Sequence, residues 1–127
     1  MTRVLVVEDD EDIRDLVAML LSNRGYDVLT RGDAADVLTL ARTGAFDVLL
    51  MDVSLPGRDG LDTTRLMRAE PAIAELPVLL MTARTRQEDI DRGYAAGADD
   101  YVVKPFISDD LVSRLEAALE RRRVSEH

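Results

Sequence analysis

"LLMDVSLPGRDG", residues 49–60, sets an ionisable aspartate, Asp52, at the end of an apolar run with strand character and follows it with a turn. An uncompensated charge is costly away from water, so a buried strand that ends on a carboxylate needs a reason. One reason is a strand end that lies in water. The other is a carboxylate placed there to react.

Short apolar runs and helical stripes alternate along the chain. Besides the run at 47–51, four segments have the composition of buried strands: 4–7, 28–29, 77–81 and 101–103. Apolar residues at helical spacing lie between and after them: around 13–21, 34–41, 61–67, 90–94 and 111–119. Because the strands are continuously apolar, helices should cover both faces of the sheet. The pattern therefore predicts an α/β fold with five parallel strands and five helices.

Local signals mark where several helices begin and end. Glycines that can adopt a left-handed C-cap stand just beyond three helical stripes: Gly25, Gly44 and Gly97. Ser108 precedes two aspartates, as at a helix start, where acids favour the positive end of the helix dipole. One domain is expected over residues 1–121, and residues 122–127 are expected to be a frayed tail or the start of a linker.

The composition limits the function classes. The formal net charge of −9 repels phosphate backbones and anionic lipids, so we expect no direct binding of nucleic acid or membrane by this domain. The absence of cysteine excludes thiol chemistry and Cys-ligated metals. No apolar run is long enough to span a bilayer, and the N-terminus turns acidic too soon for a signal peptide. A cytoplasmic location is the resulting expectation.

Polar side chains follow the ends of four predicted strands, at the sheet edge where open α/β sheets bind ligands. They are Glu8, Asp9, Asp10, Asp52, Thr82 and Lys104. Carboxylates gathered so closely repel one another unless a cation joins them. Oxygen ligands without cysteine favour Mg²⁺, with Mn²⁺ as a substitute.

Each of these residues also has an ordinary structural interpretation. The acids at 8–12 alone could be an acidic helix start, Lys104 a solvated lysine and Thr82 a hydroxyl bonded to backbone. Asp52 could be a fixed metal ligand or the nucleophile that forms an aspartyl phosphate. A metal site alone would need neither Lys104 nor Thr82, whereas a phosphoryl group needs partners for its oxygens. Their joint placement favours phosphoryl transfer.

Four motifs together resemble the receiver domain of bacterial two-component response regulators, and in particular receivers attached to winged-helix DNA-binding domains. The motifs are "VLVVEDDEDIR", "DVLLMDVSLPGRDG", "VLLMTAR" and "GADDYVVKPF", within a likeness that covers residues 3 to about 121. The resemblance implies a flavodoxin-like doubly wound sheet with strand order 2-1-3-4-5. That order would place Glu8 and Asp9 opposite Asp52.

The resemblance also implies the chemistry of single residues. Asp52 would be the phosphoacceptor, and Lys104, joined to Pro105 by a cis peptide, would pair with the phosphoryl group. The implied ligands of Mg²⁺ are Glu8, Asp9, Asp52 and the main-chain carbonyl of Ser54. The phosphoryl group would come from a histidine kinase or a histidine phosphotransfer protein, since the only histidine of the chain is His127 at its very end.

A switch is implied in the same way. Thr82 would be the switch hydroxyl and Tyr101 the aromatic side chain that turns inward on activation. Ser54 and Arg84, at the mouth of the site, would tune the lifetime of the phosphorylated state. The face formed by the fourth helix, the fifth strand and the fifth helix would then control an output partner.

The resemblance allows a homodimer through that face, because its charges are of the expected type: Asp99, Asp100, Asp110, Arg114 and Arg121. Ile90, however, stands where a basic partner for Asp110 would be expected.

Two other functions are open at this point. A Mg²⁺-dependent aspartyl-phosphate phosphatase or phosphotransferase also uses an Asp and a Lys, but it needs an acid two residues after the nucleophile, where this chain has Ser54. An inactive pseudo-receiver would act only through binding, and the complete set of polar residues argues against it. Because a receiver is favoured over the phosphatase, we expect no turnover of an external substrate.

Overall fold

Five strands and five helices alternate in the computed structural model, which describes residues 1–83, 86–105 and 108–125, with side chains up to residue 121. The strands are β1 (Arg3–Val7), β2 (Asp27–Arg31), β3 (Val48–Asp52), β4 (Val78–Thr82) and β5 (Asp100–Val103). The helices are α1 (Glu11–Asn23), α2 (Val37–Arg42), α3 (Gly60–Ala69), α4 (Gln87–Ala96) and α5 (Ser108–Ser125).

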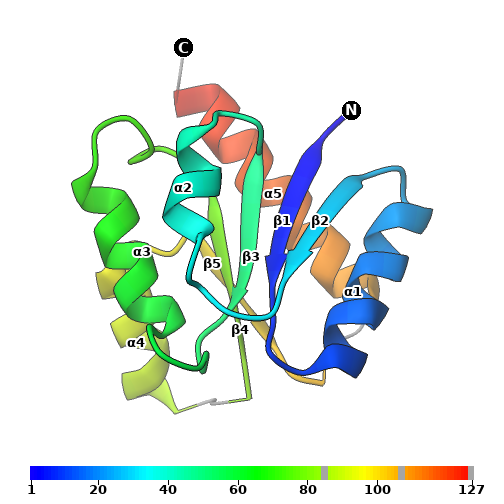
Figure 1. Ribbon diagram of the computed structural model, residues 1–127, viewed down its shortest axis with the longest axis horizontal. Helices are drawn as coiled ribbons and strands as arrows, with labels where there is room; N and C mark the ends of the chain where they lie inside the picture. The colour runs from blue at the N-terminus through cyan, green and yellow to red at the C-terminus, as the bar shows by residue number, and fades with distance from the viewer. Residues whose placement is uncertain (84–85, 106–107, 126–127) are drawn as a thin grey trace.

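The strands form one parallel sheet in the order β2-β1-β3-β4-β5 (Figure 1). This is the predicted flavodoxin-like doubly wound arrangement. The order of strands reverses between β1 and β3, where Val7 lies opposite Met51. A switch point of this kind opens a crevice at the carboxyl ends of the strands.

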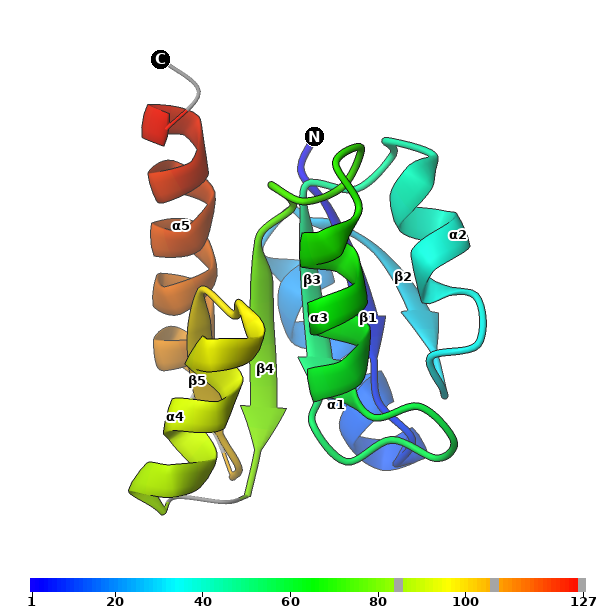
Figure 2. The ribbon, with the colours of Figure 1, turned by 90° about the vertical axis from the view of Figure 1, so that its left-hand side faces the viewer.

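Helices cover both faces of the sheet (Figures 1 and 2). One face packs against α1 and α5, through residues such as Leu21 and Leu115. The other packs against α2, α3 and α4, through residues such as Val37 and Met67. Every residue of β3 and β4 is buried as a result, which explains why their sequences are continuously apolar up to Asp52 and Thr82.

The predicted helix ends are largely confirmed. The three glycines have positive φ, with values of 91° at Gly25, 73° at Gly44 and 108° at Gly97, and α5 begins at Ser108. The second helix, however, begins at Val37 and not at Ala34. Ala34 is buried in the bend before the helix, so its apolar spacing reflects burial and not helical structure.

The backbone of α5 continues to Ser125, into the segment for which a frayed tail or the start of a linker was predicted. The arginines at 121–123 are good helix formers and suit the negative end of the dipole, which favours this extension.

Candidate functional site

Two carboxylates end neighbouring strands at the centre of the sheet. Asp52 is the last residue of β3, and Glu8 directly follows β1. Both are buried, with exposed fractions of 6% for Asp52 and 1% for Glu8. Neither therefore lies in water, which removes the simple explanation of a solvated strand end.

Lys104 lies between these carboxylates. Its main-chain N–H donates to the carbonyl of Thr82 at 2.8 Å, which anchors the segment after β5 beside the end of β4. Its Nζ donates to Glu8 Oε2 at 2.8 Å and to Asp52 Oδ2 at 3.0 Å. The Lys104–Pro105 peptide is cis, as the resemblance to receiver domains implied.

Asp9 completes an acidic group with Glu8 and Asp52. One carboxylate oxygen from each of the three lies within 4.8 Å of the other two. Burial raises the pKa of the Glu8 carboxyl, and the charge of Asp52 adds to that increase while Lys104 opposes it. Lys104 contacts only two of these three carboxylates, Glu8 and Asp52, so a hard divalent cation with oxygen ligands fits this group.

Burial by itself lowers the pKa of Lys104. The hydrogen bonds and negative charges of Glu8 and Asp52 outweigh that effect, so the pKa is raised and the ammonium is stabilised. A fixed positive charge beside Asp52 suits the binding of a group with negatively charged oxygens.

The loop after β3 is tied closely to Asp52. The main-chain N–H of Ser54 donates to Asp52 Oδ1 at 3.0 Å, and that of Gly60 donates to the Val53 carbonyl at 2.9 Å. A Cβ on Gly60 would collide with the Asp52 carbonyl oxygen and lie 3.0 Å from the Cα of Val53. Gly60 is therefore required for the close approach of α3 to the end of β3.

The remaining predicted site residues occupy different places. Thr82 is buried at the end of β4, on the same edge as Asp52. Asp10 caps α1 by accepting the Ile13 N–H at 3.1 Å, which is the ordinary role the sequence allowed for it. Arg84 lies outside the described residues.

Tyr101 lies in an inward position beneath α4. The residue is 6% exposed, and its ring meets that of Tyr94 edge to face with 5.4 Å between the centroids. Its hydroxyl donates to the Asp89 carbonyl at 2.9 Å. The tyrosine fits there because Gly93 has no side chain, and a Cβ at that position would collide with the phenol.

The sequence did not single out Arg14. Its Nη1 donates to the main-chain carbonyl of Glu8 at 3.0 Å, from the first turns of α1. This contact ties α1 to the strand end that carries the acidic pair. The arginine within "EDDEDIR" was its only signal in the sequence.

Fold and site together define an α/β protein of the flavodoxin-like class, with buried acids and a lysine at the switch point. The model of the response regulator receiver domain family matches residues 4–116, and this chain belongs to that family.

Relatives agree with this assignment. The chain is 39% identical over 119 residues to the DNA-binding response regulator MtrA of Mycolicibacterium smegmatis, a match that covers 94% of this chain and 51% of MtrA. The chain thus spans about half the length of this curated relative.

Two solved structures are also similar. A response regulator of Chloroflexus aurantiacus gives a TM-score of 0.89 at 32% identity and covers 94% of this chain and 98% of its own. The receiver domain of the sensor histidine kinase PA1611 from Pseudomonas aeruginosa, solved with magnesium in its active site cleft, gives 0.86 at 30% identity, with coverage of 94% and 98%. Within the described part of this chain, no helix is long and apolar enough to cross a membrane.

Proposed function

We propose that this domain is a phosphorylation-activated signalling switch in which Asp52 accepts the phosphoryl group. The observation that carries the proposal is the placement of Lys104 Nζ between the carboxylates of Glu8 and Asp52. With Asp9 nearby, the carboxylates of this site outnumber the lysine ammonium. A catalytic site for phosphoryl transfer needs a nucleophile and fixed positive charge at the same place.

Mg²⁺ is the proposed cofactor, with Mn²⁺ as a substitute. Its ligands would be the carboxylates of Glu8, Asp9 and Asp52 and the main-chain carbonyl of Ser54. The magnesium coordinated in the PA1611 receiver domain supports this choice. When bound, the ion would neutralise charge on the phosphoryl group during its transfer.

The chain's own residues perform the remaining steps. An oxygen of Asp52 forms the new O–P bond as the bond between phosphorus and the donor breaks. Lys104 then pairs with one phosphoryl oxygen, and the Thr82 hydroxyl donates to another. The donor would be a histidine kinase or a histidine phosphotransfer protein, and hydrolysis would return Asp52 to its free form. Ser54 and Arg84 would tune the rate of that hydrolysis. No external substrate is turned over.

The proposed output is a population shift of the face formed by α4, β5 and α5. Tyr101 belongs to this face, and its burial against Gly93 makes its position sensitive to any shift of α4. The name of MtrA makes control of a DNA-binding unit the first output to test.

A homodimer through the same face is a separate proposal. Arg114 already pairs within the chain, with Asp100 at 2.9 Å and Asp110 at 3.1 Å. A dimer that uses these charges would have to exchange existing ion pairs for new ones. Sedimentation with and without beryllofluoride would measure whether it forms.

Acetyl phosphate and Mg²⁺ provide the direct test of the switch. We expect a mass increase of one phosphoryl group that requires Mg²⁺ and is lost in Asp52→Asn. Asp12→Asn, which removes an exposed acid of the same charge from α1, should leave the adduct intact. An adduct that persists in Asp52→Asn would overturn the assignment. Sustained hydrolysis of phosphate esters would favour the phosphatase, and no adduct in any protein would favour the pseudo-receiver.

A further inference from the structure

The carboxyl end of β1 is held by a side chain as well as by the sheet. β1 pairs with β2 as far as Val7 and Arg31, and the Glu8 N–H then donates to the Arg31 carbonyl at 3.0 Å. The Glu8 carbonyl accepts from α1, where Arg14 Nη1 donates to it at 3.0 Å. Because only 1% of Glu8 is exposed, water is a poor substitute for this donor. The guanidinium therefore takes the place of a main-chain donor at this strand end.

The peptide that Arg14 holds is the one that joins Glu8 to Asp9. Because a peptide unit is planar, a donor that fixes the Glu8 carbonyl also fixes the N–H and Cα of Asp9. Within the described residues the Asp9 carboxylate has no hydrogen bond or ion pair of its own. The Glu8 carboxylate, in contrast, accepts from Lys104 and from the Asp10 N–H. The direction of the Asp9 carboxylate is therefore set by its main chain.

Gly32, which directly follows β2, leaves room for the guanidinium. A Cβ at this position would lie 3.0 Å from Arg14 Nη1 and 3.9 Å from Arg14 Cζ. The guanidinium thus lies beside the main chain at the ends of two neighbouring strands, at Glu8 and at Gly32. Close contact with both segments limits the movement of the Arg14 side chain.

Arg14 makes no ion pair within the described part of the chain, although acids are its neighbours in the sequence. Asp10 and Glu11 stand four and three residues before it, at the spacing of helical ion pairs. The guanidinium donates to a main-chain carbonyl instead. This choice of partner indicates a role in holding the main chain and not in balancing the charge of α1.

We propose that Arg14 is a positioning residue for the metal site, which acts through the Glu8–Asp9 peptide to direct the Asp9 carboxylate. The proposal rests on the proposed Mg²⁺ site and extends it to a residue that touches neither the ion nor the phosphoryl group. Mg²⁺ demands nearly octahedral ligands at about 2.0–2.1 Å, whereas Ca²⁺ accepts flexible geometry at about 2.3–2.6 Å. A loosened Asp9 should therefore weaken Mg²⁺ binding more than Ca²⁺ binding.

The charge of Arg14 and its position predict opposite effects on metal affinity. Removing a cation near three carboxylates should by itself strengthen binding of a divalent cation, because a repulsive charge is lost. Losing the hydrogen bond to the Glu8 carbonyl should weaken binding, because partners that orient metal ligands change metal affinity by about tenfold or more. Arg14→Met removes both the charge and the bond. Arg14→Lys keeps the charge, but its ammonium ends short of the Nη1 position and loses the bond.

The test is an NMR titration of residues 1–127 with Mg²⁺ and with Ca²⁺, in which the amide signals of Asp9 and Ser54 report binding. We expect the Mg²⁺ dissociation constant to rise about tenfold in Arg14→Met and about threefold in Arg14→Lys. The Ca²⁺ dissociation constant should change by less than about twofold in both variants.

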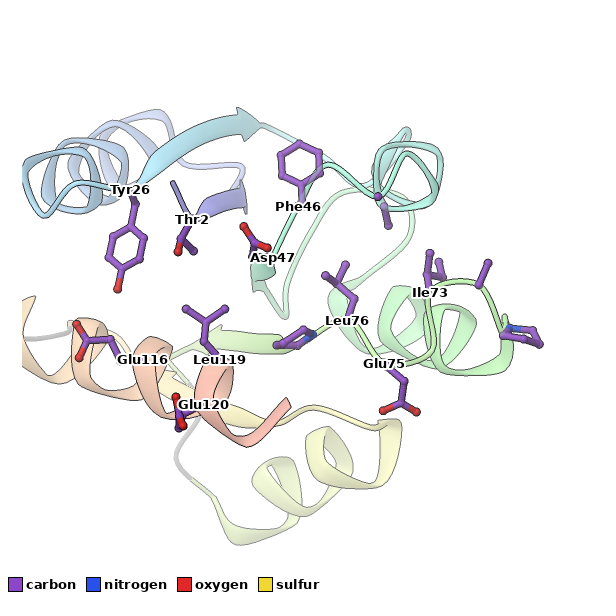
Figure 3. Close-up of a pocket in the computed structure, with 15 residues that line it drawn as sticks. Thr2, Tyr26, Phe46, Asp47, Ile73, Glu75, Leu76, Glu116, Leu119 and Glu120 are labelled. Carbon is purple, nitrogen blue, oxygen red and sulfur yellow. The ribbon is translucent and has the colours of Figure 1, made fainter. Parts of the chain in front are cut away.

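Arg58→Met is the matched control. It removes an exposed arginine from the loop after β3 and should leave the Mg²⁺ dissociation constant within about twofold of the native value. Tyr26, Phe46 and Leu119 line a hollow at the opposite edge of the sheet (Figure 3), so their amide signals report the fold away from the site. These signals should stay in place in every variant.

Native Mg²⁺ affinity in Arg14→Lys would overturn the proposal, even if Arg14→Met does not fold. Tighter Mg²⁺ binding by Arg14→Met, or an equal loss of Mg²⁺ and Ca²⁺ binding, would overturn it as well. The native chain separates this failure from that of the proposed function. If the native chain does not bind Mg²⁺, the metal site itself is wrong, and the role of Arg14 is wrong with it. If the native chain binds Mg²⁺ and takes a phosphoryl group while the variants bind normally, only the role of Arg14 is wrong.

Discussion

Two groups of charged side chains lie at opposite edges of the sheet and are built in opposite ways. At the amino edge, Arg68 pairs with Asp99 at 2.9 Å and also donates to three main-chain carbonyls. We call these residues the Arg68 cluster. At the carboxyl edge, Lys104 is shared by Glu8 and Asp52, with Asp9 close by, and these four form the Lys104 cluster.

The difference lies in the balance of charge. In the Arg68 cluster the guanidinium meets a carboxylate directly, and Asp99 also accepts the Val78 N–H at 2.8 Å, which joins the end of α3 to the starts of β4 and β5. In the Lys104 cluster the acids outnumber the lysine, and burial raises the pKa of Glu8. A balanced cluster stabilises the fold, whereas an unbalanced one is left ready for a cation or a phosphoryl group.

Breaking the balanced cluster should have the largest effect on stability. Arg68→Leu removes the guanidinium that pairs with the largely buried Asp99 and is expected to lower the free energy of unfolding by about 3 kcal/mol. Urea unfolding followed by circular dichroism measures it.

Arg65→Leu is the matched control on the same helix. Arg65 pairs with Asp62 at the surface, so its loss should cost less than about 1 kcal/mol. Equal destabilisation by the two substitutions would mean that the Arg68 cluster is no more important than a surface pair.

A glycine packs against each cluster: Gly60 against the main chain of Asp52, and Gly97 against the side chain of Arg68. The two glycines allow a second comparison. Gly60→Ala would push against the main chain of Asp52 and Val53, which cannot yield easily, and should cost about 2 kcal/mol. Gly97→Ala would press on the flexible side chain of Arg68 and should cost about 1–2 kcal/mol, mainly for its positive φ.

Only the first of these substitutions should weaken Mg²⁺ binding, because only Gly60 touches the strand that carries Asp52. Isothermal titration with Mg²⁺ separates the two variants. The same Mg²⁺ affinity in both would contradict a link between Gly60 and the site.

Removing a charge from the unbalanced cluster should have a smaller effect. Asp52→Asn leaves Lys104 paired with Glu8 and removes repulsion, so without metal we expect a change within about 1 kcal/mol. Added Mg²⁺ should raise the melting temperature of the native chain and not that of the variant. A loss of stability as large as that of Arg68→Leu would show that Asp52 has a structural role.

The Lys104 cluster could be predicted from the sequence and the Arg68 cluster could not. Glu8, Asp52 and Lys104 follow apolar runs, and parallel strands bring their carboxyl ends to one edge. Arg68 stands on an ordinary amphipathic helix, and most of its partners are main-chain carbonyls that no residue type reveals. Sequence reasoning likewise placed Gly60 in a turn but gave no sign that its missing Cβ lets α3 approach β3.

Removing the exposed ion pair of Arg42 and Glu70 should have the smallest effect on the free energy of unfolding. Comparison with the buried pair of Arg68 and Asp99 shows how much burial contributes. Arg42 donates to both carboxylate oxygens of Glu70, and these hydrogen bonds hold the pKa of Glu70 below its usual 4.5. The pair should therefore stabilise the fold above that pH and lose its effect as the pH falls through the lowered pKa. Unfolding of the native chain and Glu70→Gln from pH 7 to pH 3 should show a small difference that vanishes in acid. A difference that grows in acid would mean that Glu70 is stabilised in its protonated form.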